Sequence, residues 1–244
     1  KVIIIPARYK SSRFPGKPLA KILGKEMILR VLEICNRVFD KKKIFVATDN
    51  KKICEIVKNN KFNVIMTSKK CLTGTDRVAE ANSKIKSNII INVQGDEPTI
   101  NLTDIKKIIL AKEKYPKHVI CGYTLISKKD DPNNINLPKV VINNKSDLIY
   151  MSRSPIPGKK EYKKKINYLK QVCIYAFNKG ELKKFKKYGK KSNLETIEDI
   201  EILRFFEIGI PIKMIQLSKS SIAVDIKTDI KKVEKYLLKW KKNF

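Results

Sequence analysis

Short apolar runs rich in β-branched residues alternate with longer amphipathic segments through the first half of the chain. Such runs are typical of strands buried on both faces, and apolar residues three to four positions apart are typical of helices. The pattern predicts strands at 2–5, 43–47, 63–66 and 88–93 and helices at 27–39, 51–59, 75–85 and 103–112. Repeated βα units favour a mostly parallel sheet with helices on both faces.

The second half has a less regular pattern. It predicts strands at 118–126, 139–142, 149–152, 169–177 and 213–216, a strong helix at 194–208, and a closing helix within 225–240. The Pro- and Asn-rich connector at 132–138 is the expected entry to a smaller insertion. We therefore predict one domain over residues 1–244, with an insertion at about 132–190.

Composition narrows the class of protein. Hydrophobic residues make up 42% of the chain, and no apolar run approaches the roughly 20 residues of a membrane span. The first apolar run ends at Pro6, too early for a signal peptide, and the five cysteines form no C-x-x-C pair. We expect a cytoplasmic protein with reduced thiols and no stable insertion into a membrane. His118 is the single histidine, so a metal would be held by carboxylates, which favours Mg²⁺.

The formal net charge of +30 invites a nucleic-acid-binding interpretation. Of the 54 basic residues, however, only seven are Arg, and the lysines are scattered along the whole chain. Lys, Ile and Asn are abundant and share A/T-rich codons, so genome composition accounts for the pattern. We expect no nucleic-acid partner, although a general positive field would help to capture anionic substrates. A basic nucleic-acid-binding protein remains the alternative from a different class.

A cationic loop follows the first strand. Residues 6–18 contain three prolines and Gly16, which forbid regular structure, and four cations, Arg8, Lys10, Arg13 and Lys17. Ligands of open α/β sheets bind outside the carboxyl ends of the strands, where this loop begins. The loop matches neither G-x-x-x-x-G-K-[ST] nor G-x-G-x-x-G, so side chains would have to hold any phosphates. A polyphosphate cradle and a solvated basic loop are both compatible with these residues.

Two acidic positions follow strand-like segments. Asp96 and Glu97 come directly after the strand at 88–93, with Gly95 allowing a tight turn, and Asp225 follows a short apolar run. Two carboxylates together with substrate phosphates are a usual Mg²⁺ site. The alternatives are an ordinary acidic turn for Asp96 and a helix N-cap for Asp225.

Arginine is rare here, so its positions are informative. Arg77 stands in Leu-Thr-Gly-Thr-Asp-Arg before a predicted helix, where Thr75 or Asp76 is the expected cap and the exposed amides favour an anion or a polar ligand edge. Lys does not easily replace Arg in planar bidentate contacts. Four arginines fall in loops or at strand ends and are candidates for ligand contacts, whereas three in helices are expected to be structural: Arg8, Arg13, Arg77 and Arg153, against Arg30, Arg37 and Arg204.

Seven segments together resemble the 3-deoxy-manno-octulosonate cytidylyltransferase (CMP-Kdo synthetase) family. They are, in order, IIPARxxSSRFPGKP, VATD, TGTDR, NVQGDEP, YMSRSPIP, IYAF and VD, between residues 4 and 225. The resemblance implies a Rossmann-like nucleotidyltransferase fold, with a central mostly parallel mixed sheet, helices on both faces and a small dimerisation subdomain. It also implies a homodimer that converts CTP and Kdo to CMP-Kdo and pyrophosphate for lipopolysaccharide or surface polysaccharide synthesis.

The same resemblance implies roles for individual residues. Arg8, Arg13 and Lys17 would bind the triphosphate and stabilise the departing pyrophosphate, and Asp96 and Asp225 would hold Mg²⁺; these five are the expected catalytic residues. The other expected CTP contacts are Pro6, Ala7, Ser11, Gly74, Thr75, Arg77 and Gln94, with Asp96 shared. The expected contacts to the sugar acid are Arg153, Gln171, Tyr175, Glu198 and Ile202.

Two departures from the family pattern fall in the sugar half. Gln171 replaces a histidine, and Ile202 replaces a glutamine four residues after Glu198, on the same face of the predicted helix. We hypothesise that the acceptor is a modified Kdo or another 3-deoxy-ulosonic acid. A CMP-nonulosonate or other sugar-acid nucleotidyltransferase is the nearer alternative. Sialic-acid-type enzymes share the early Pro-Ala-Arg but continue with a shorter, Gly-rich loop, which residues 9–16 do not match.

Overall fold

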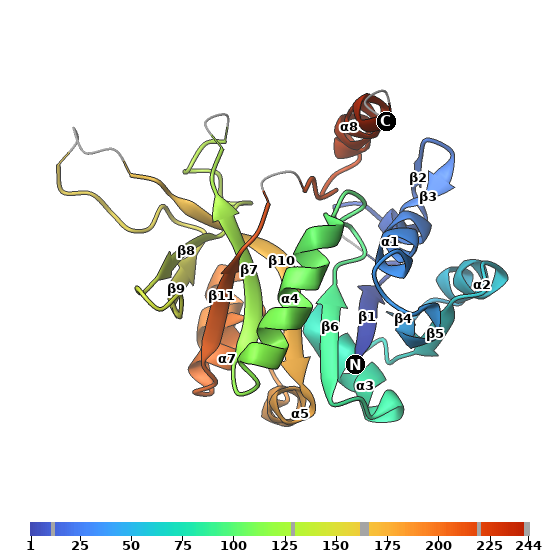
Figure 1. Ribbon diagram of the computed structural model, residues 1–244, viewed down its shortest axis with the longest axis horizontal. Coiled ribbons are helices and arrows are strands. Elements are labelled where there is room, and N and C mark those ends of the chain that lie inside the picture. The colour runs from blue at the N-terminus through green and yellow to red at the C-terminus, as the bar shows by residue number, and fades with distance from the viewer. Residues whose placement is uncertain (11–12, 128–129, 162–165, 219–220, 242–244) are drawn as a thin grey trace.

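A nine-stranded mixed sheet forms the centre of the computed structural model, which describes residues 1–10, 13–127, 130–161, 166–218 and 221–241 (Figure 1). Seven strands follow the order β11-β7-β10-β6-β1-β4-β5, and β8 and β9 join it through β10. Within that path, neighbouring strands are parallel except where β10 pairs with β6 and β7. The predicted fold class, a mostly parallel mixed sheet, is confirmed.

The strands of the sheet are β1 Val2–Ala7, β4 Ile44–Thr48, β5 Asn63–Met66, β6 Ile89–Val93, β7 Val119–Leu125, β8 Lys139–Ile142, β9 Leu148–Ser152, β10 Leu169–Asn178 and β11 Ile212–Gln216. A separate hairpin consists of β2 Lys21–Ile22 and β3 Lys25–Glu26. The α-helices are α1 Met27–Asn36, α2 Lys51–Asn59, α3 Gly74–Ile85, α4 Leu102–Lys114, α5 Lys179–Tyr188, α6 Asn193–Glu198, α7 Leu203–Glu207 and α8 Asp229–Lys241. Two 3₁₀ turns are η1 Lys17–Leu19 and η2 Lys41–Lys43.

Hydrophobic layers cover both faces of the sheet. Successive side chains of a strand point to opposite faces, so Ile3 and Ile5 pack with α1, α2 and α4, whereas Val2 and Ile4 pack with α3, α5 and α7. Ile3, Ile4 and Ile5 are completely buried. This arrangement explains why β1 is apolar throughout, up to its carboxyl end at Ala7.

The predicted helix over 194–208 is wrong. α6 ends at Glu198, Asp199 adopts a left-handed conformation with φ of 48°, and α7 begins only at Leu203. Asp tolerates this conformation better than most residues, and the Lys191 ammonium donates a hydrogen bond to its carboxylate at 3.0 Å. The break lets Ile200 and Ile202 both enter the core.

Two further differences concern helix starts. Thr73, and not Thr75 or Asp76, caps α3: its hydroxyl accepts from the Asp76 amide while Asp76 accepts from the Thr73 amide. Residues 179–188 form α5, which the sequence did not predict, because lysines occupy half of its ten positions. Asn178 starts this helix with a capping box, and Leu182 and Phe185 are its buried apolar side chains.

The hairpin of β8 and β9 projects from the main body beside β10 (Figure 1). It lies inside the predicted insertion at 132–190, but that range also includes β10 and α5, which belong to the central layers. A dimerisation role for this region stays a prediction. In the described part of the chain, no helix is long and apolar enough to cross a membrane.

Candidate active site

A cavity of about 290 Å³ opens at the carboxyl ends of β1 and β6. Its walls come from the loop after β1, the turn after β6, the start of α3, the α6–α7 segment and Asp225. Nine of the expected CTP contacts line it: Pro6, Ala7, Arg8, Arg13, Lys17, Gly74, Arg77, Gln94 and Asp96. Thr75 lies behind this surface and is completely buried, and Ser11 is outside the described residues.

Lys17 crosses the cavity floor to the acidic turn. Gly16, with φ of 72°, turns the chain into η1, and this places the Lys17 ammonium 2.5 Å from Asp96 Oδ2 and 2.9 Å from the Val224 carbonyl oxygen. The Lys17 side chain is therefore held within the site by these contacts, and is not merely a solvated surface charge. This contact joins residues 79 positions apart in the sequence.

The strand-like run before Asp225 is bound to the turn after β6. The Val224 amide donates to the Asp96 carbonyl oxygen at 3.0 Å, and the Ile222 amide donates to Thr99 Oγ1 at 2.7 Å. Asp225 consequently reaches the same cavity as Asp96, and Arg13 Nη2 lies 3.5 Å from Asp225 Oδ1.

Asp225 does not cap the last helix. The carboxylate of Asp229, the first residue of α8, accepts from the amides of Asp225 and Ile226, both at 3.1 Å. The Asp225 side chain points to the cavity instead. The N-cap alternative raised by the sequence is therefore wrong.

Glu97 is a buried acid beside these two carboxylates. Burial raises the pKa of Glu97 to about 7; a hydrogen bond from the Ser221 hydroxyl opposes the rise, and Asp96 and Asp225 add to it. Asp96 and Asp225 each already lie beside a cation, Lys17 and Arg13 respectively. Among the described residues, no three acidic, His or Cys side chains form a metal-binding group, so Asp96 and Asp225 could hold a metal only with oxygens from a ligand.

Glu201 is a site residue that the sequence did not reveal. Its carboxylate accepts from the Thr75 amide at 2.9 Å and from Gln94 Nε2 at 3.3 Å, and burial raises its pKa. A Cβ on Gly74 would lie 3.5 Å from Glu201 Oε2, an ordinary van der Waals contact, so the approach of Glu201 does not itself require glycine. The expected continuous helix gave no reason to turn Glu201 towards α3; the left-handed turn at Asp199 does so.

Arg77 lines the cavity, but its guanidinium is committed elsewhere. It donates to Asp49 Oδ2 at 3.0 Å and to Thr67 Oγ1 at 2.5 Å, at the carboxyl ends of β4 and β5. The side chain is almost fully buried. These contacts indicate that Arg77 fixes α3 to the sheet edge and supports the cavity wall.

Two of the expected sugar contacts bind each other. Arg153 donates to the carbonyl oxygens of Glu198, Ile135 and Asp199 at 2.5, 2.7 and 3.0 Å. The Glu198 carboxylate accepts from the Ser152 hydroxyl at 2.6 Å and the Arg153 amide at 2.8 Å. Together they fasten the end of β9 to α6, and neither lines the cavity.

The remaining expected sugar contacts lie in different surroundings. Gln171 Nε2 donates to the Tyr175 hydroxyl at 3.1 Å on β10, outside the cavity lining. Ile202 is completely buried in the core and shares no helix face with Glu198, because the helix breaks between them. The structural argument for a lost polar contact beside Glu198 is therefore wrong.

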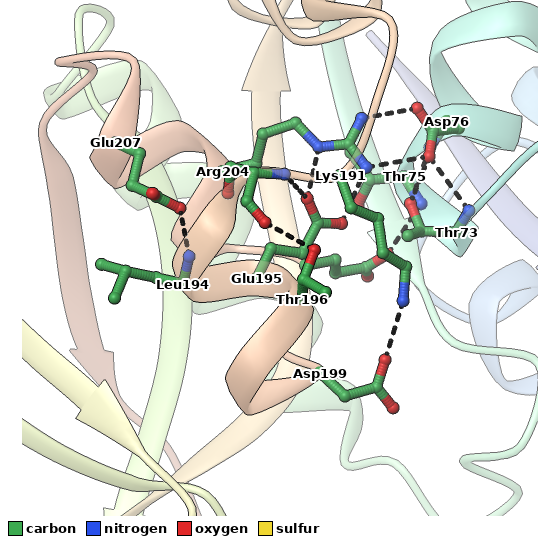
Figure 2. Close-up of polar contacts among 12 residues, drawn as sticks. Thr73, Thr75, Asp76, Lys191, Leu194, Glu195, Thr196, Asp199, Arg204 and Glu207 are labelled. Carbon is green, nitrogen blue, oxygen red and sulfur yellow. Dashed lines mark hydrogen bonds and ion pairs between the residues drawn. The ribbon is translucent and has the colours of Figure 1, made fainter.

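Four charged residues from 191–201 line the cavity without having been predicted: Lys191, Glu195, Asp199 and Glu201. Figure 2 shows several of these side chains in the region where the segment faces α3. They form a wall opposite the basic loop. The sequence provided no signal for this wall, because its charged residues are irregularly spaced and match no motif.

An open sheet with a polar cavity at the carboxyl ends of its parallel strands defines a ligand-binding α/β protein. A solved inositol-1-phosphate CTP transferase from T. maritima has the same fold, with a TM-score of 0.71 at 14% identity over 97% of this chain and 94% of that chain. A solved CMP:2-keto-3-deoxy-manno-octonic acid synthetase complexed with CTP matches with a TM-score of 0.90 and 35% identity over 98% of both chains.

Curated relatives agree with the structural comparison. The 3-deoxy-manno-octulosonate cytidylyltransferases of Porphyromonas gingivalis and Christiangramia forsetii are 38% and 36% identical to this chain, over 97% of it and 96% of each relative. The cytidylyltransferase family model matches residues 2–221. The chain belongs to this cytidylyltransferase family, as the resemblance in the sequence implied.

Proposed function

We propose that this protein transfers the CMP group of CTP to 3-deoxy-manno-octulosonate, releasing pyrophosphate. The observation that carries the proposal is that the cationic loop after β1 meets Asp96 and Asp225 in one cavity. The similarity to curated enzymes of that name, over nearly the whole chain, supports the choice of both substrates.

The reaction is an in-line displacement at phosphorus. The anomeric hydroxyl oxygen of the sugar acid attacks the α-phosphorus, and a new P–O bond forms. The bond to the β-phosphate oxygen breaks, pyrophosphate leaves with the electron pair, and the hydroxyl proton passes to solvent. Because little acid–base chemistry is required, positioning and charge neutralisation supply the acceleration.

The basic loop is suited to the triphosphate. Arg8 and Arg13 are exposed at the cavity and Lys17 closes its floor, so three cations face one space. They neutralise the triphosphate and the charge that develops on pyrophosphate. The contacts of Lys17 with Asp96 and of Arg13 with Asp225 balance the charges of the two acids.

Asp96 and Asp225 fit Mg²⁺ as hard oxygen ligands. Two carboxylates leave most coordination positions to phosphate oxygens and water, in agreement with the lack of a larger metal-binding group among the described residues. When bound, the ion would neutralise and polarise the reacting phosphate oxygens. A second ion on the β- and γ-phosphates is compatible with this arrangement.

We propose Kdo as the acceptor, with Arg153, Glu198, Gln171 and Tyr175 on the sugar side. Both Arg153 and Glu198 belong to one network that ends at Asp199, a residue of the cavity wall. The argument that Ile202 indicates a different acid has lost its structural basis, because the helix breaks between Glu198 and Ile202. Gln171, in place of the histidine of the family pattern, remains the reason to test related acids, including nonulosonates.

We also propose a cytoplasmic homodimer that supplies lipopolysaccharide or surface polysaccharide synthesis. All five cysteines are unpaired, which fits a reducing compartment. The projecting β8–β9 hairpin offers an extended surface to a second copy. Analytical ultracentrifugation at micromolar concentration should give a mass near 56 kDa, twice the 28.2 kDa of one chain; a monomer mass would contradict the dimer.

Pyrophosphate release from a panel of nucleoside triphosphates and sugar acids tests the reaction. With Mg²⁺ present, we expect turnover with CTP and Kdo that exceeds every other pairing. A preference for a nonulosonate would replace the acceptor, and turnover with another nucleotide but not CTP would contradict the proposed function.

Asp96→Asn and Asp225→Asn test the metal assignment. Each keeps the size of the side chain but removes the negative charge, so each should lower kcat at saturating CTP by about 100-fold or more. Circular dichroism confirms the fold of each variant. A rate similar to that of the unmodified protein in either variant would remove that residue from the metal site.

A further inference from the structure

The α6–α7 segment holds the first turn of α3 at two points. Figure 2 shows Arg204 between the carboxylates of Asp76 and Glu195, and the Thr73–Asp76 turn beside them. Glu201 supplies the second point by accepting from the Thr75 amide at 2.9 Å. The turn held in this way contributes Thr73 and Gly74 to the cavity wall.

The fully buried guanidinium of Arg204 contacts two acids, the buried Glu195 and the partly buried Asp76. Its Nε and Nη2 donate to Glu195 at 2.6 and 2.7 Å, and its Nη1 and Nη2 donate to Asp76 at 2.8 and 3.2 Å. The guanidinium carbon lies 3.8 Å from the centre of the Phe185 ring. A lysine ammonium is a point charge and cannot reproduce this two-sided fork.

Asp76 passes this constraint to the cavity wall. The same carboxylate that receives Arg204 accepts from the Thr73 amide at 3.0 Å and from the Thr73 hydroxyl at 2.8 Å. The orientation of Asp76 therefore determines where α3 begins and how Gly74 faces the cavity. No side-chain atom of Arg204 needs to reach a ligand for this effect, since Arg204 is not part of the lining.

We propose that Arg204 is a positioning residue for the nucleotide: through Asp76 it fixes the Thr73–Gly74 turn against which CTP binds. The inference rests on the proposed function, because it takes the ligand of this cavity to be CTP. If Arg204 had a purely structural role, its substitution would only destabilise the fold. Removing one partner of a buried ion pair commonly has that effect.

The test compares two buried ion pairs in the same protein. Arg204→Lys and Asp76→Asn weaken the link to the cavity turn. Lys112→Gln breaks the buried pair with Glu181, in which Lys112 Nζ lies 2.8 Å from the carboxylate and neither residue lines the cavity. Thermal denaturation, CTP titration calorimetry and steady-state kinetics are measured for all three variants.

We expect Kd and KM for CTP to rise about tenfold in Arg204→Lys and Asp76→Asn, with kcat within about twofold of the original. Lys112→Gln should lower Tm about as much as Arg204→Lys and Asp76→Asn do, but it should leave CTP affinity unchanged. Unchanged CTP affinity in Arg204→Lys would overturn this inference but not the proposed function. If Arg204→Lys does not fold, unchanged affinity in Asp76→Asn would do the same. Equal loss of affinity in Lys112→Gln would do the same, by showing that general destabilisation is the cause. Failure of the unmodified protein to bind CTP would instead refute the proposed function, and this inference with it.

Discussion

The residues of the cavity are organised by charge balance. Asp96 and Asp225 each lie beside a cation of the β1 loop, at 2.5 and 3.5 Å, in a region where Glu97 is already buried. The cations therefore compensate these acids and are placed to compensate the phosphates of a nucleotide. Lys17 is central to both states because it alone of the loop cations touches Asp96 among the described contacts.

Lys17→Met should lower kcat/KM by about 100-fold, because a cation facing the developing pyrophosphate charge is lost. Lys10→Met is the matched control, since Lys10 belongs to the same loop, is exposed and is not part of the cavity lining. Steady-state pyrophosphate release measures both variants. Equal rates in the two variants would show that Lys17 is only a surface charge.

Glu97 should give the metal-free protein an unusual pH dependence. Its folded pKa of about 7 lies above the ordinary value of 4.5, so the folded state holds the proton more tightly than the unfolded state. Its contribution to stability is complete below about pH 4.5 and is lost as pH rises through 7, by up to about 3 kcal/mol.

Urea unfolding at pH 5 and pH 8 in EDTA measures this effect. The free energy of unfolding should fall with pH in the original protein, and the Glu97→Gln variant should show a smaller fall. Parallel pH profiles for the two proteins would show that Glu97 titrates normally.

At the scale of elements, the site depends on where strands and helices end. β1 and β6 are adjacent and parallel, so the loop after Ala7 and the turn after Val93 meet at one edge. The break between α6 and α7 adds the opposite wall. By contrast, α5 contributes nothing to the cavity lining and serves the core through Leu182 and Phe185.

Asn178→Ala should therefore destabilise the protein without affecting catalysis. Asn178 Oδ1 accepts from the Glu181 amide at 2.8 Å, and loss of such a cap costs about 1 kcal/mol, or roughly 2–4 °C in Tm for a chain of this size. Asn193→Ala, at an exposed first position of α6, is the control. A fall in kcat/KM without a fall in Tm would contradict the assigned role of α5.

At the scale of the whole molecule, the sequence predicted the sheet because its strands are continuous β-branched runs, as in residues 2–5 and 88–93. It also placed Lys17 and Asp96 at one edge, since parallel strands end together. It did not predict Glu201, because the turn at Asp199 depends on contacts made only in the folded chain. It placed Arg204 correctly in a helix but missed its partners, Asp76 and Glu195.

Two buried cysteines, Cys35 and Cys121, allow the packing of the core to be tested by alkylation. Burial raises the pKa of Cys35 and of Cys121 to about 12, and both side chains are completely buried. Iodoacetamide at pH 8 should leave these two thiols unmodified in the folded protein and should modify all five in denaturant. Mass spectrometry of peptides locates the label; rapid native labelling of Cys35 or Cys121 would contradict the packing described here.

The most direct test of the central claim is the identity and stoichiometry of the products. The protein, incubated with CTP, Kdo and Mg²⁺, should form CMP-Kdo and pyrophosphate in a 1:1 ratio, observed by mass spectrometry and by a pyrophosphate assay. Pyrophosphate without a CMP-sugar, or no reaction under these conditions, would contradict the assignment of this cavity to cytidylyl transfer.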